Sequence, residues 1–355
     1  MTVSTAERWA AAGTTHSLDA VVMPSDAAAF ATTDLLIDLF GGLPFRGRDA
    51  QLRGVRRKRL DAAATIGLLG RISRDVYVVK QLTDGGDDDQ LHERALAIQL
   101  AIPGAVISHE SAARLHGLDF RRRWRRRHEG DLVTATVPGG SHLARDGYRT
   151  VSARVPQQQR VTIDGIVTTG PARTAVDLAR QSNLGDGLAV CDSAMRKLVL
   201  RAALTMKLDD RVAVHRDDLR TRARESLELV ARDMPRWPGI RPARRAILEA
   251  DPASESPLES ASRAVAITAG LPAPKVGWPI TLPNGRTVWG DLVWLEERVV
   301  GEADGALKYT SRDDLMREKL REDALRSCGW TVVRWTWNEA VVEPHLLVRK
   351  LHRVL

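Results

Sequence analysis

The chain has few cysteines and no long apolar run. Its two cysteines, Cys191 and Cys328, lie far apart and match neither a metal-binding nor a redox spacing, which is typical of a reducing cytoplasm. No apolar stretch reaches the roughly 18 to 20 residues that a membrane span needs. Residues 1–24 also lack the basic segment followed by an apolar stretch that marks a secretion signal. The sequence therefore predicts a cytoplasmic protein that has no membrane partner.

The composition is that of a folded protein with an excess of positive charge. Hydrophobic residues make up 43% and charged residues 28% of the 355 residues, which excludes a disordered chain and suggests two or three domains. The net charge is +8, and arginine far outnumbers lysine. Because the planar guanidinium matches phosphate oxygens, this balance favours a nucleic-acid partner. A GC-rich genome, which encodes Arg and Ala readily, is the alternative explanation.

The N-terminal part of the chain predicts a flexible arm followed by a winged helix-turn-helix. Residues 1–31 are rich in Ala, Ser and Thr and show little periodicity, which indicates the arm. A helical pattern begins at Thr32, where Thr33 and Asp34 offer an N-cap. The order helix, helix, glycine turn, helix and β-wing over residues 32–82 is typical of a winged helix-turn-helix. The later elements are expected as helices over 48–53 and 56–68, and as a turn followed by a strand over 71–79.

Two basic clusters are candidates for DNA binding. The third helix opens with four cations where a recognition helix would meet DNA, although such a run can also simply face water. In the second cluster, six arginines surround one tryptophan over residues 121–127, where they could grip phosphates while the indole stacks on a base. An exposed loop of low sequence constraint is the alternative there. The candidate DNA-binding residues are Arg56, Arg57, Lys58, Arg59, Arg122, Arg123, Trp124 and Arg125.

The middle of the chain predicts a small α+β domain. A Gly- and Asp-rich linker covers residues 83–90, the domain covers 91–180, and a helical connector covers 181–250. His109 and His116 have no third metal ligand at a suitable spacing, so we interpret them as structural. The domain's helices are expected over 91–100, 109–116 and 171–180, and its strands over 104–108, 132–137, 149–153 and 165–168.

This middle region resembles a known bacterial family. The segments that carry the resemblance are 107–117 (ISHESAARLHG), 137–142 (VPGGSH) and 168–179 (TTGPARTAVDLA). They are similar to proteins with an AbiEi-type antitoxin-like N-terminal region, over about residues 34–180. The resemblance implies a winged helix that binds DNA, often the protein's own promoter, followed by a small mixed domain. It also implies that a toxin could be encoded by a neighbouring gene.

The last hundred residues carry a set of acidic residues beside apolar strand residues. From residue 254 the expected order is helix, strand, strand, strand, helix, strand, helix. Glu259 lies in the first of these helices, Asp291 in the strand over 288–294, and Glu302 and Asp304 at the end of the next strand. Carboxylates at such positions are costly to bury unless a metal or a partner compensates them. The spacing therefore indicates divalent-cation chemistry.

These residues also resemble a nuclease family. The segments 255–260 (ESPLES), 290–294 (GDLVW), 301–305 (GEADG), 317–323 (REKLRED) and 329–334 (GWTVVR) are similar to the very-short-patch-repair-like endonucleases of the PD-(D/E)xK superfamily. The resemblance implies a restriction-endonuclease-like domain over 251–355 that binds Mg²⁺ or Mn²⁺ through Asp291 and Glu302. Asp304 would add a ligand or orient the attacking water, and Glu259 would reach in from its helix.

The sequence departs from that pattern at one important position. The superfamily's usual lysine, two residues after the glutamate, is Asp304 here. Lys308 could supply the missing cation, and Lys319 or Arg321 could supply it from the helix. A nuclease fold that has lost turnover and merely holds DNA is the alternative. Among the tryptophans, Trp337 lies just past a strand and is the candidate for stacking on DNA, whereas Trp289, Trp294, Trp330 and Trp335 are expected in the core.

Together these patterns predict a multidomain α/β protein that binds double-stranded DNA. The preferred function is a Mg²⁺-dependent endonuclease that hydrolyses phosphodiester bonds in DNA repair or defence. The alternative is a non-catalytic, DNA-binding transcriptional regulator of antitoxin type that carries an inactive nuclease fold. An RNA-cleaving enzyme is a weaker third possibility, because a winged helix points to duplex DNA.

Overall fold

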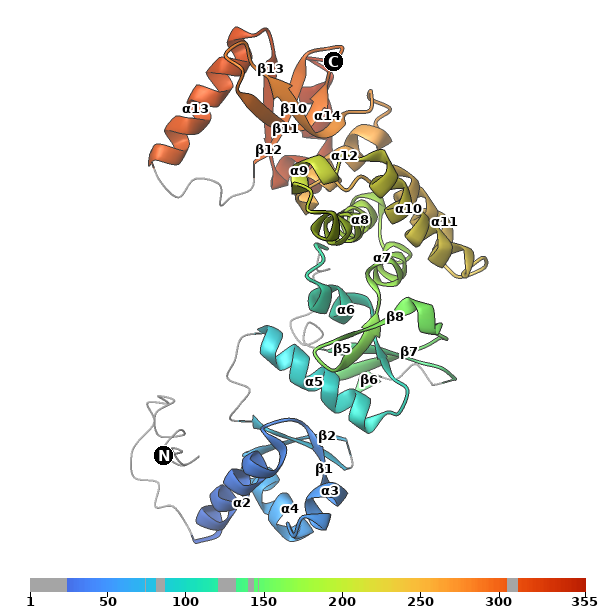
Figure 1. Cartoon of the computed structure of the whole chain (residues 1–355), viewed down its shortest axis with the longest axis vertical. Coiled ribbons are helices and arrows are strands. Elements are labelled where there is room, and N and C mark those ends of the chain that lie inside the picture. Colours follow the sequence, from blue (N-terminus) through green and yellow to red (C-terminus); the bar gives the residue numbers. More distant parts are fainter. Residues whose placement is uncertain are drawn as a thin grey trace. The chain divides into compact units, whose positions relative to one another are not determined.

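The computed structural model describes residues 24–73, 75–80, 87–120, 132–139, 144–145, 147–304 and 312–355. These residues form an α/β structure with three separate sheets, so the predicted multidomain α/β fold is confirmed at this level (Figure 1). The chain divides into two compact units, Met1–Leu115 with Trp124–Gly170, and His116–Arg123 with Pro171–Leu355. None of the helices within the described ranges is long and apolar enough to cross a membrane.

The N-terminal part of the first unit is three helices packed on a small sheet. The helices are α2 (Pro24–Phe40), α3 (Gly47–Leu52) and α4 (Arg57–Thr65). The sheet has the order β1-β3-β2, with β1 (Phe45–Arg46), β2 (Leu69–Ser73) and β3 (Val76–Val79). Leu36, Leu60 and Tyr77 are fully buried between helices and sheet. The three predicted helices and a strand over 76–79 are found, whereas β1, between the first two helices, was not predicted.

Two details of this region differ from the sequence prediction. The first helix begins at Pro24 and not at Thr32. Thr32 and Thr33 do not cap it, since their hydroxyls donate to the carbonyls of Ala28 and Ala29 in the same helix. These threonines are therefore satisfied inside a helix that the alanine-rich segment extends towards the N-terminus. Within 71–79, predicted as a turn followed by one strand, residues 71–73 instead belong to strand β2. Its ladder with the apolar strand β3 contains a bulge between Arg71 and Ser73.

The second part of the first unit is a six-stranded sheet of order β6-β7-β5-β4-β9-β8. Helix α5 (Asp87–Ala101) packs its buried Leu91, Ala95 and Ile98 on this sheet. Its Ala97 instead joins Val76 and Val78 of the N-terminal hairpin. The remaining elements are β4 (Val106–Ile107), α6 (His109–His116), β5 (Val133–Val137), β6 (Ala144–Arg145), β7 (Tyr148–Ser152), β8 (Arg160–Ile163) and β9 (Ile166–Thr169).

The predicted helices and strands of this part are found, with two corrections. Residues 87–90, placed in the linker, begin α5, since acidic residues are favoured in the first turn of a helix. Strands β6 and β8 were not predicted. Both lie at the edges of the sheet. Strand β6 has only two residues, and the four residues of β8 are at most partly buried, so neither has a clear apolar strand pattern.

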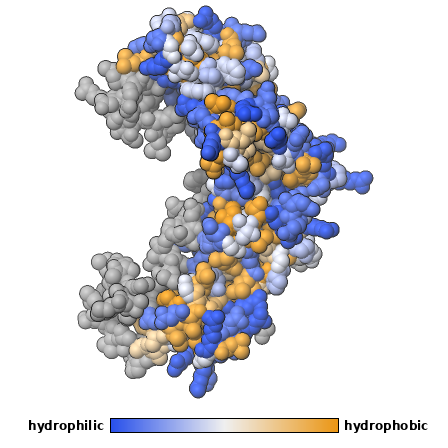
Figure 2. Space-filling view, in the orientation of Figure 1, coloured by the Kyte–Doolittle hydropathy of each residue, from blue (hydrophilic) through white to orange (hydrophobic). Residues whose placement is uncertain are grey.

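The second unit begins with a helical layer around α8 (Leu184–Met206). Asn183 caps this helix by accepting the Asp186 backbone N–H at 2.9 Å. Helices α7 (Pro171–Ala179), α10 (Asp217–Arg232), α11 (Ile240–Glu249) and α12 (Pro257–Thr268) pack around it, and the short α9 (Asp210–Ala213) follows it. The predicted connector is therefore helical, and α7 packs with it in this unit. The amphipathic helices α10 and α11 leave a mainly hydrophilic surface (Figure 2).

A buried polar network ties α12 to α8. The Asp192 carboxylate of α8 accepts from the Arg263 guanidinium at 2.6 Å and from the Ser260 hydroxyl at 2.7 Å. It also accepts from the Asp251 backbone N–H at 2.8 Å. A buried charge with this many donors is compensated, whereas removal of one partner would leave it orphaned. The network fixes the position of the helix that carries Glu259.

The second unit ends in a four-stranded sheet of order β10-β11-β12-β13. Neighbouring strands β10, β11 and β12 are antiparallel, whereas β12 and β13 are parallel and are joined through α13. Trp294 and Trp335 are buried as predicted, whereas Trp289 and Trp330 are only partly buried. Its helices and strands follow in the predicted order. They are β10 (Lys275–Thr281), β11 (Thr287–Trp294), β12 (Val299–Asp304), α13 (Arg312–Ser327), β13 (Thr331–Thr336), the π-helix η3 (Asn338–Val342) and α14 (Pro344–Leu351).

Candidate functional site

The first candidate site is the start of α4, where four cations face solvent. Arg56, Arg57, Lys58 and Arg59 are all exposed, and the N-cap residue Arg56 makes no side-chain cap hydrogen bond. Positive charge at a helix N-terminus is disfavoured by the helix dipole. A single exposed ion pair, Arg57 with Asp61 at 3.8 Å, offsets little of this cost. The arrangement is therefore unfavourable for the helix itself, but it is suited to binding an anion such as a phosphate.

The charge of the surrounding region has the same sign. Residues 24–80 contain ten Arg and Lys against six Asp and Glu, so their formal net charge is 10 − 6 = +4. Arg48 and Arg71 are also exposed in this region. The other predicted DNA-binding residues, Arg122, Arg123, Trp124 and Arg125, lie outside the described residues.

The second candidate site lies where strands β11 and β12 carry their acidic residues. The ladder between these strands pairs Leu292 with Gly301, so Asp291 and Glu302 are the next residues on neighbouring strands. The Asp291 carboxylate accepts the Ala303 backbone N–H at 2.8 Å. Glu302 is buried, with 4% of its surface exposed. The predicted Asp291 and Glu302 are therefore brought together, in positions set by the antiparallel ladder.

Burial and mutual repulsion perturb two glutamates of this cluster. Loss of hydration raises the pKa of Glu302 from 4.5 to about 7, and the negative charge of Asp291 adds to the rise. The same two causes, in the same order, raise the pKa of Glu259 from 4.5 to about 7. Glu259 therefore also lies within electrostatic reach of Asp291. The cluster is acidic and crowded, as the sequence predicts.

Two arginines compensate the strand carboxylates. The Arg321 guanidinium of α13 donates to Glu302 Oε1 at 2.8 Å and also to the Trp289 carbonyl of β11. The Arg334 guanidinium of β13 lies 3.1 Å from Asp304 Oδ1 and 3.0 Å from Glu322 Oε2. Arg334 is also the parallel-ladder partner of Glu302. Positive charge is therefore present beside these carboxylates, although residue 304 is not the lysine that the endonuclease resemblance would lead one to expect.

The Glu259 side chain also stabilises the N-terminus of α12. Its Oε2 accepts the Glu255 backbone N–H at 2.8 Å, and its Oε1 accepts the Ser256 hydroxyl at 2.8 Å. Ser256 in turn is the N-cap of α12 and accepts the Glu259 backbone N–H. This reciprocal arrangement is a variant of a capping box, which the spacing of serine and glutamate three residues apart could have indicated. Both carboxylate oxygens of Glu259 are thus used by the helix start.

The described residues do not fit a Mg²⁺ site as they stand. No group of three His, Cys, Asp or Glu side chains in the described ranges is arranged to hold a metal ion. Magnesium needs near-octahedral oxygen ligands, yet Glu302 and Asp304 are paired with arginines and Glu259 caps a helix. Of the cations proposed to replace the lysine, Arg321 contacts Glu302, Lys319 is exposed, and Lys308 lies outside the described residues.

Residues of the helical layer cover one side of the acidic cluster. A cavity of about 40 Å³, lined among others by Glu255, Glu259 and Asp291, is bordered by Arg211 and His215. The His215 ring stacks on Trp289, and its Nε2 lies 2.9 Å from the Gly277 carbonyl oxygen. The sequence prediction missed Arg211 and His215, since nothing in the local pattern links them to strands that follow some 60 residues later.

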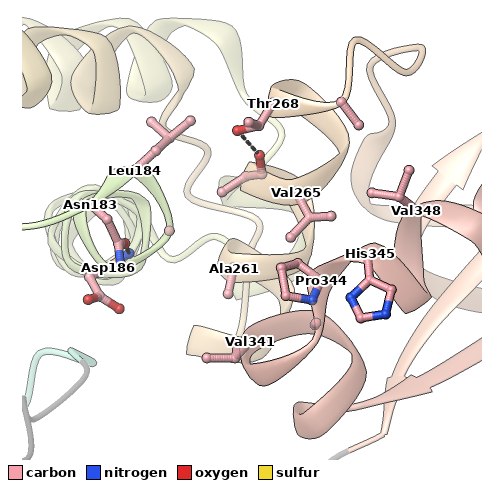
Figure 3. A pocket seen from close by; sticks show the side chains of 14 residues that line it. Asn183, Leu184, Asp186, Ala261, Val265, Thr268, Val341, Pro344, His345 and Val348 are labelled. Carbon is pink, nitrogen blue, oxygen red and sulfur yellow. Dashed lines mark hydrogen bonds between the residues drawn. The ribbon is translucent and has the colours of Figure 1, made fainter.

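A larger cavity of about 520 Å³ lies elsewhere in the second unit, between the start of α8, α12 and the η3–α14 segment (Figure 3). Leu184, Ala261, Val265 and Pro344 give it a mostly apolar lining. The Thr268 hydroxyl beside it is bonded to the Ala264 carbonyl. Among the residues that the structure describes, its lining includes none of the predicted site residues.

Comparison with known proteins supports the antitoxin-like region. Residues 104–229 match the family of the AbiEi antitoxin C-terminal domain. The match covers the later part of the predicted region and extends beyond it into the helices around α8, but it does not include residues 34–103 or 255–355. The endonuclease resemblance therefore stays a prediction.

The chain is also similar to proteins of Mycobacterium tuberculosis. It is 28% identical over 301 residues to the uncharacterized protein MT2308 of strain CDC 1551 / Oshkosh. The same values hold for the uncharacterized protein Rv2248 of strain ATCC 25618 / H37Rv. The similarity covers 84% of this chain and 97% of each relative, so it extends over most of both units.

Proposed function

We propose that the protein is a DNA-binding regulator of antitoxin type. The observation that carries the proposal is the start of α4, where four exposed cations stand at a helix N-terminus that they do not stabilise. The similarity of residues 104–229 to an antitoxin domain supports the same class of function. A toxin whose activity the protein opposes would be its second partner.

The proposal assigns the N-terminal helices and hairpin to a winged helix-turn-helix. Helix α4 follows α3 after a short turn with Gly54 at a φ of +90°, and the β2–β3 hairpin follows α4. In such a domain the start of the second helix of the turn enters the major groove, and the hairpin contacts the backbone. Arg56–Arg59 would then bind phosphates and base edges of double-stranded DNA.

The test measures binding to duplex DNA that contains the protein's own promoter. A variant with Arg56, Arg57, Lys58 and Arg59 all changed to Gln should bind at least about tenfold more weakly. The matched control changes four exposed arginines of the helical layer, Arg222, Arg232, Arg241 and Arg245, and so alters the net charge by the same amount. Equal affinity of the α4 variant and the wild-type protein, or an equal decrease in the control, would contradict the proposal.

A Mg²⁺-dependent endonuclease is the second candidate function. The crowding of Glu259, Asp291 and Glu302 favours it, because a divalent cation would relieve the repulsion that helps raise two of their pKa values to about 7. The element order of residues 257–336 is also that expected for the PD-(D/E)xK core. The arginine pairs of Glu302 and Asp304 weigh against it and favour a nuclease-like domain without turnover.

A cleavage assay separates the two candidates. The protein is incubated with duplex DNA and Mg²⁺ or Mn²⁺, beside an Asp291→Ala variant. Cleavage that disappears in the variant would establish the endonuclease. Intact DNA with both proteins, at concentrations where the DNA is bound, is the result expected for the regulator.

A further inference from the structure

The acidic cluster of the C-terminal sheet contains carboxylates that need a counter-ion. Glu302 is buried on β12, with Asp291 of β11 beside it. A buried carboxylate is stable only when a cation or several donors compensate it. In a metal-dependent site the divalent ion does this by bridging ligands from neighbouring strands.

Arg321 bridges these same two strands. Its Nη2 donates to Glu302 on β12 at 2.8 Å and to the Trp289 carbonyl on β11. The side chains of Arg321 and Glu302 are only 19% and 5% exposed, so the pair is largely shielded from water. The guanidinium therefore holds positive charge beside Glu302 and the Trp289 carbonyl, on the two strands whose Asp291 and Glu302 would hold a metal.

Arg334 compensates the negative charges of Asp304 and Glu322. From β13 it pairs with Asp304 of β12 and Glu322 of α13 at about 3 Å. Glu322 is shared with the more exposed Arg326. Among the described residues, Glu302, Asp304 and Glu322 are thus each paired with an arginine, whereas the Asp291 carboxylate accepts a backbone N–H. A carboxylate that is already paired with a guanidinium attracts a divalent cation less than an unpaired one does.

We propose that Arg321 and Arg334 are the built-in counter-ions of Glu302 and Asp304 and, for these two carboxylates, take the charge-neutralising place of the metal ion. The acidic residue at position 304 agrees with this assignment, because its carboxylate is one of the partners of Arg334. The C-terminal sheet is then stable without a metal. The inference goes beyond the proposed function, since it holds whether or not α4 binds DNA.

The test measures the melting temperature of the full chain in EDTA, in Mg²⁺ and in Mn²⁺, with calorimetric titration of each metal alone. The wild-type protein should show the same melting temperature in all three and no saturable heat. Arg321→Met should lower the melting temperature by roughly 5 °C or more, because Glu302 is left without its counter-ion. Mg²⁺ or Mn²⁺ should restore part of this decrease only in that variant.

Two further variants make the result specific. Arg326→Met removes an arginine of the same helix whose side chain is 58% exposed, so it should change the melting temperature by only about 1 °C. Adding Glu302→Gln to Arg321→Met should restore stability without metal, because the orphaned charge is gone.

A wild-type melting temperature that rises with Mg²⁺ or Mn²⁺, together with the absence of that rise in Asp291→Ala, would overturn the proposal. So would an Arg321→Met variant that melts like Arg326→Met. If Arg321→Met does not fold, the calorimetric titration of the wild-type protein with Mn²⁺ still decides: saturable heat that is absent in Asp291→Ala contradicts the inference, and no heat supports it.

Discussion

Buried carboxylates in this protein differ in how completely they are compensated. Asp192 has an arginine, a hydroxyl and a backbone donor, and Asp177 is paired with Arg173 at 2.8 Å. Glu93 of α5 is less fully compensated, since its buried Oε1 has no hydrogen-bond partner among the residues that the structure describes. Unpaired polar atoms in a protein interior reduce stability by the free energy of the hydration they give up. Such residues are where single substitutions should have clear effects.

The stability of the first unit should depend on pH through Glu93. Loss of hydration raises its pKa from 4.5 to about 7, against the opposing charge of Arg94. Because the folded pKa lies above the unfolded one, the folded state binds the proton more tightly, and stability falls as pH rises from 4.5 to about 7. Glu93→Gln should therefore raise the melting temperature at about pH 8 but have little effect below about pH 5. The exposed Glu296→Gln serves as control; a pH-independent effect at Glu93 would contradict the prediction.

Gly301 is required by close packing and not by an unusual backbone angle. A Cβ at this position would overlap the Trp335 ring and approach the Trp294 ring. Gly301→Ala should therefore destabilise the protein by about 1–3 kcal/mol through overpacking. Chemical denaturation measures the change. Gly185→Ala in the first turn of α8 is the control, because a Cβ there meets only ordinary contacts of 3.5 Å or more. Equal stability of the two variants would contradict this account.

At the scale of elements, α12 joins the helical layer to the acidic cluster. Its buried face contacts Asp192 of α8 through Arg263 and Ser260, and its first turn carries Glu259. The Trp335 indole of β13 donates to the Ser262 hydroxyl at 2.6 Å. The position of Glu259 is therefore fixed from both sides, by the helices and by the sheet.

The N-cap of α12 should contribute measurably to stability. Ser256→Ala removes the acceptor for the Glu259 backbone N–H and the donor to its carboxylate, and should cost about 1 kcal/mol in the free energy of unfolding. Ser226→Ala is the matched control, since that hydroxyl bonds only within α10 and alanine is the better helix former. Denaturant titration compares the two. A neutral Ser256→Ala would mean that Glu259 is not held by the cap.

At the scale of the whole molecule, the net charge of +8 should make DNA binding depend strongly on salt. For each phosphate that a variant no longer binds, the slope of the logarithm of affinity against the logarithm of salt concentration becomes shallower by about 0.9. Changing Arg57 and Lys58 to Gln should therefore flatten that slope by up to about 1.8, twice the value for one phosphate. Binding measured by fluorescence anisotropy over a salt series tests this. An unchanged slope would show that these cations do not bind phosphates.

Much of the fold follows from local sequence patterns. The alternating strand 331–336, the turn before Gly285 and the helix after Ser256 are predicted from periodicity and capping, which act between residues close in the chain. Such patterns also predicted that Asp291 and Glu302 lie on neighbouring strands. The edge strands β6 and β8 were not predicted, because two and four residues are too few to show a clear alternation of apolar and polar side chains.

By itself the sequence determined most of the longer helices and strands, the basic start of α4 and the carboxylates on β11 and β12. Only the tertiary structure decided what those carboxylates contact. Arg321 and Arg334 come from elements 19 and 30 residues away from their acidic partners, and His215 reaches Gly277 from a separation of 62. Ion pairs of this kind depend on distances in space after the chain has folded, for which local periodicity carries no information.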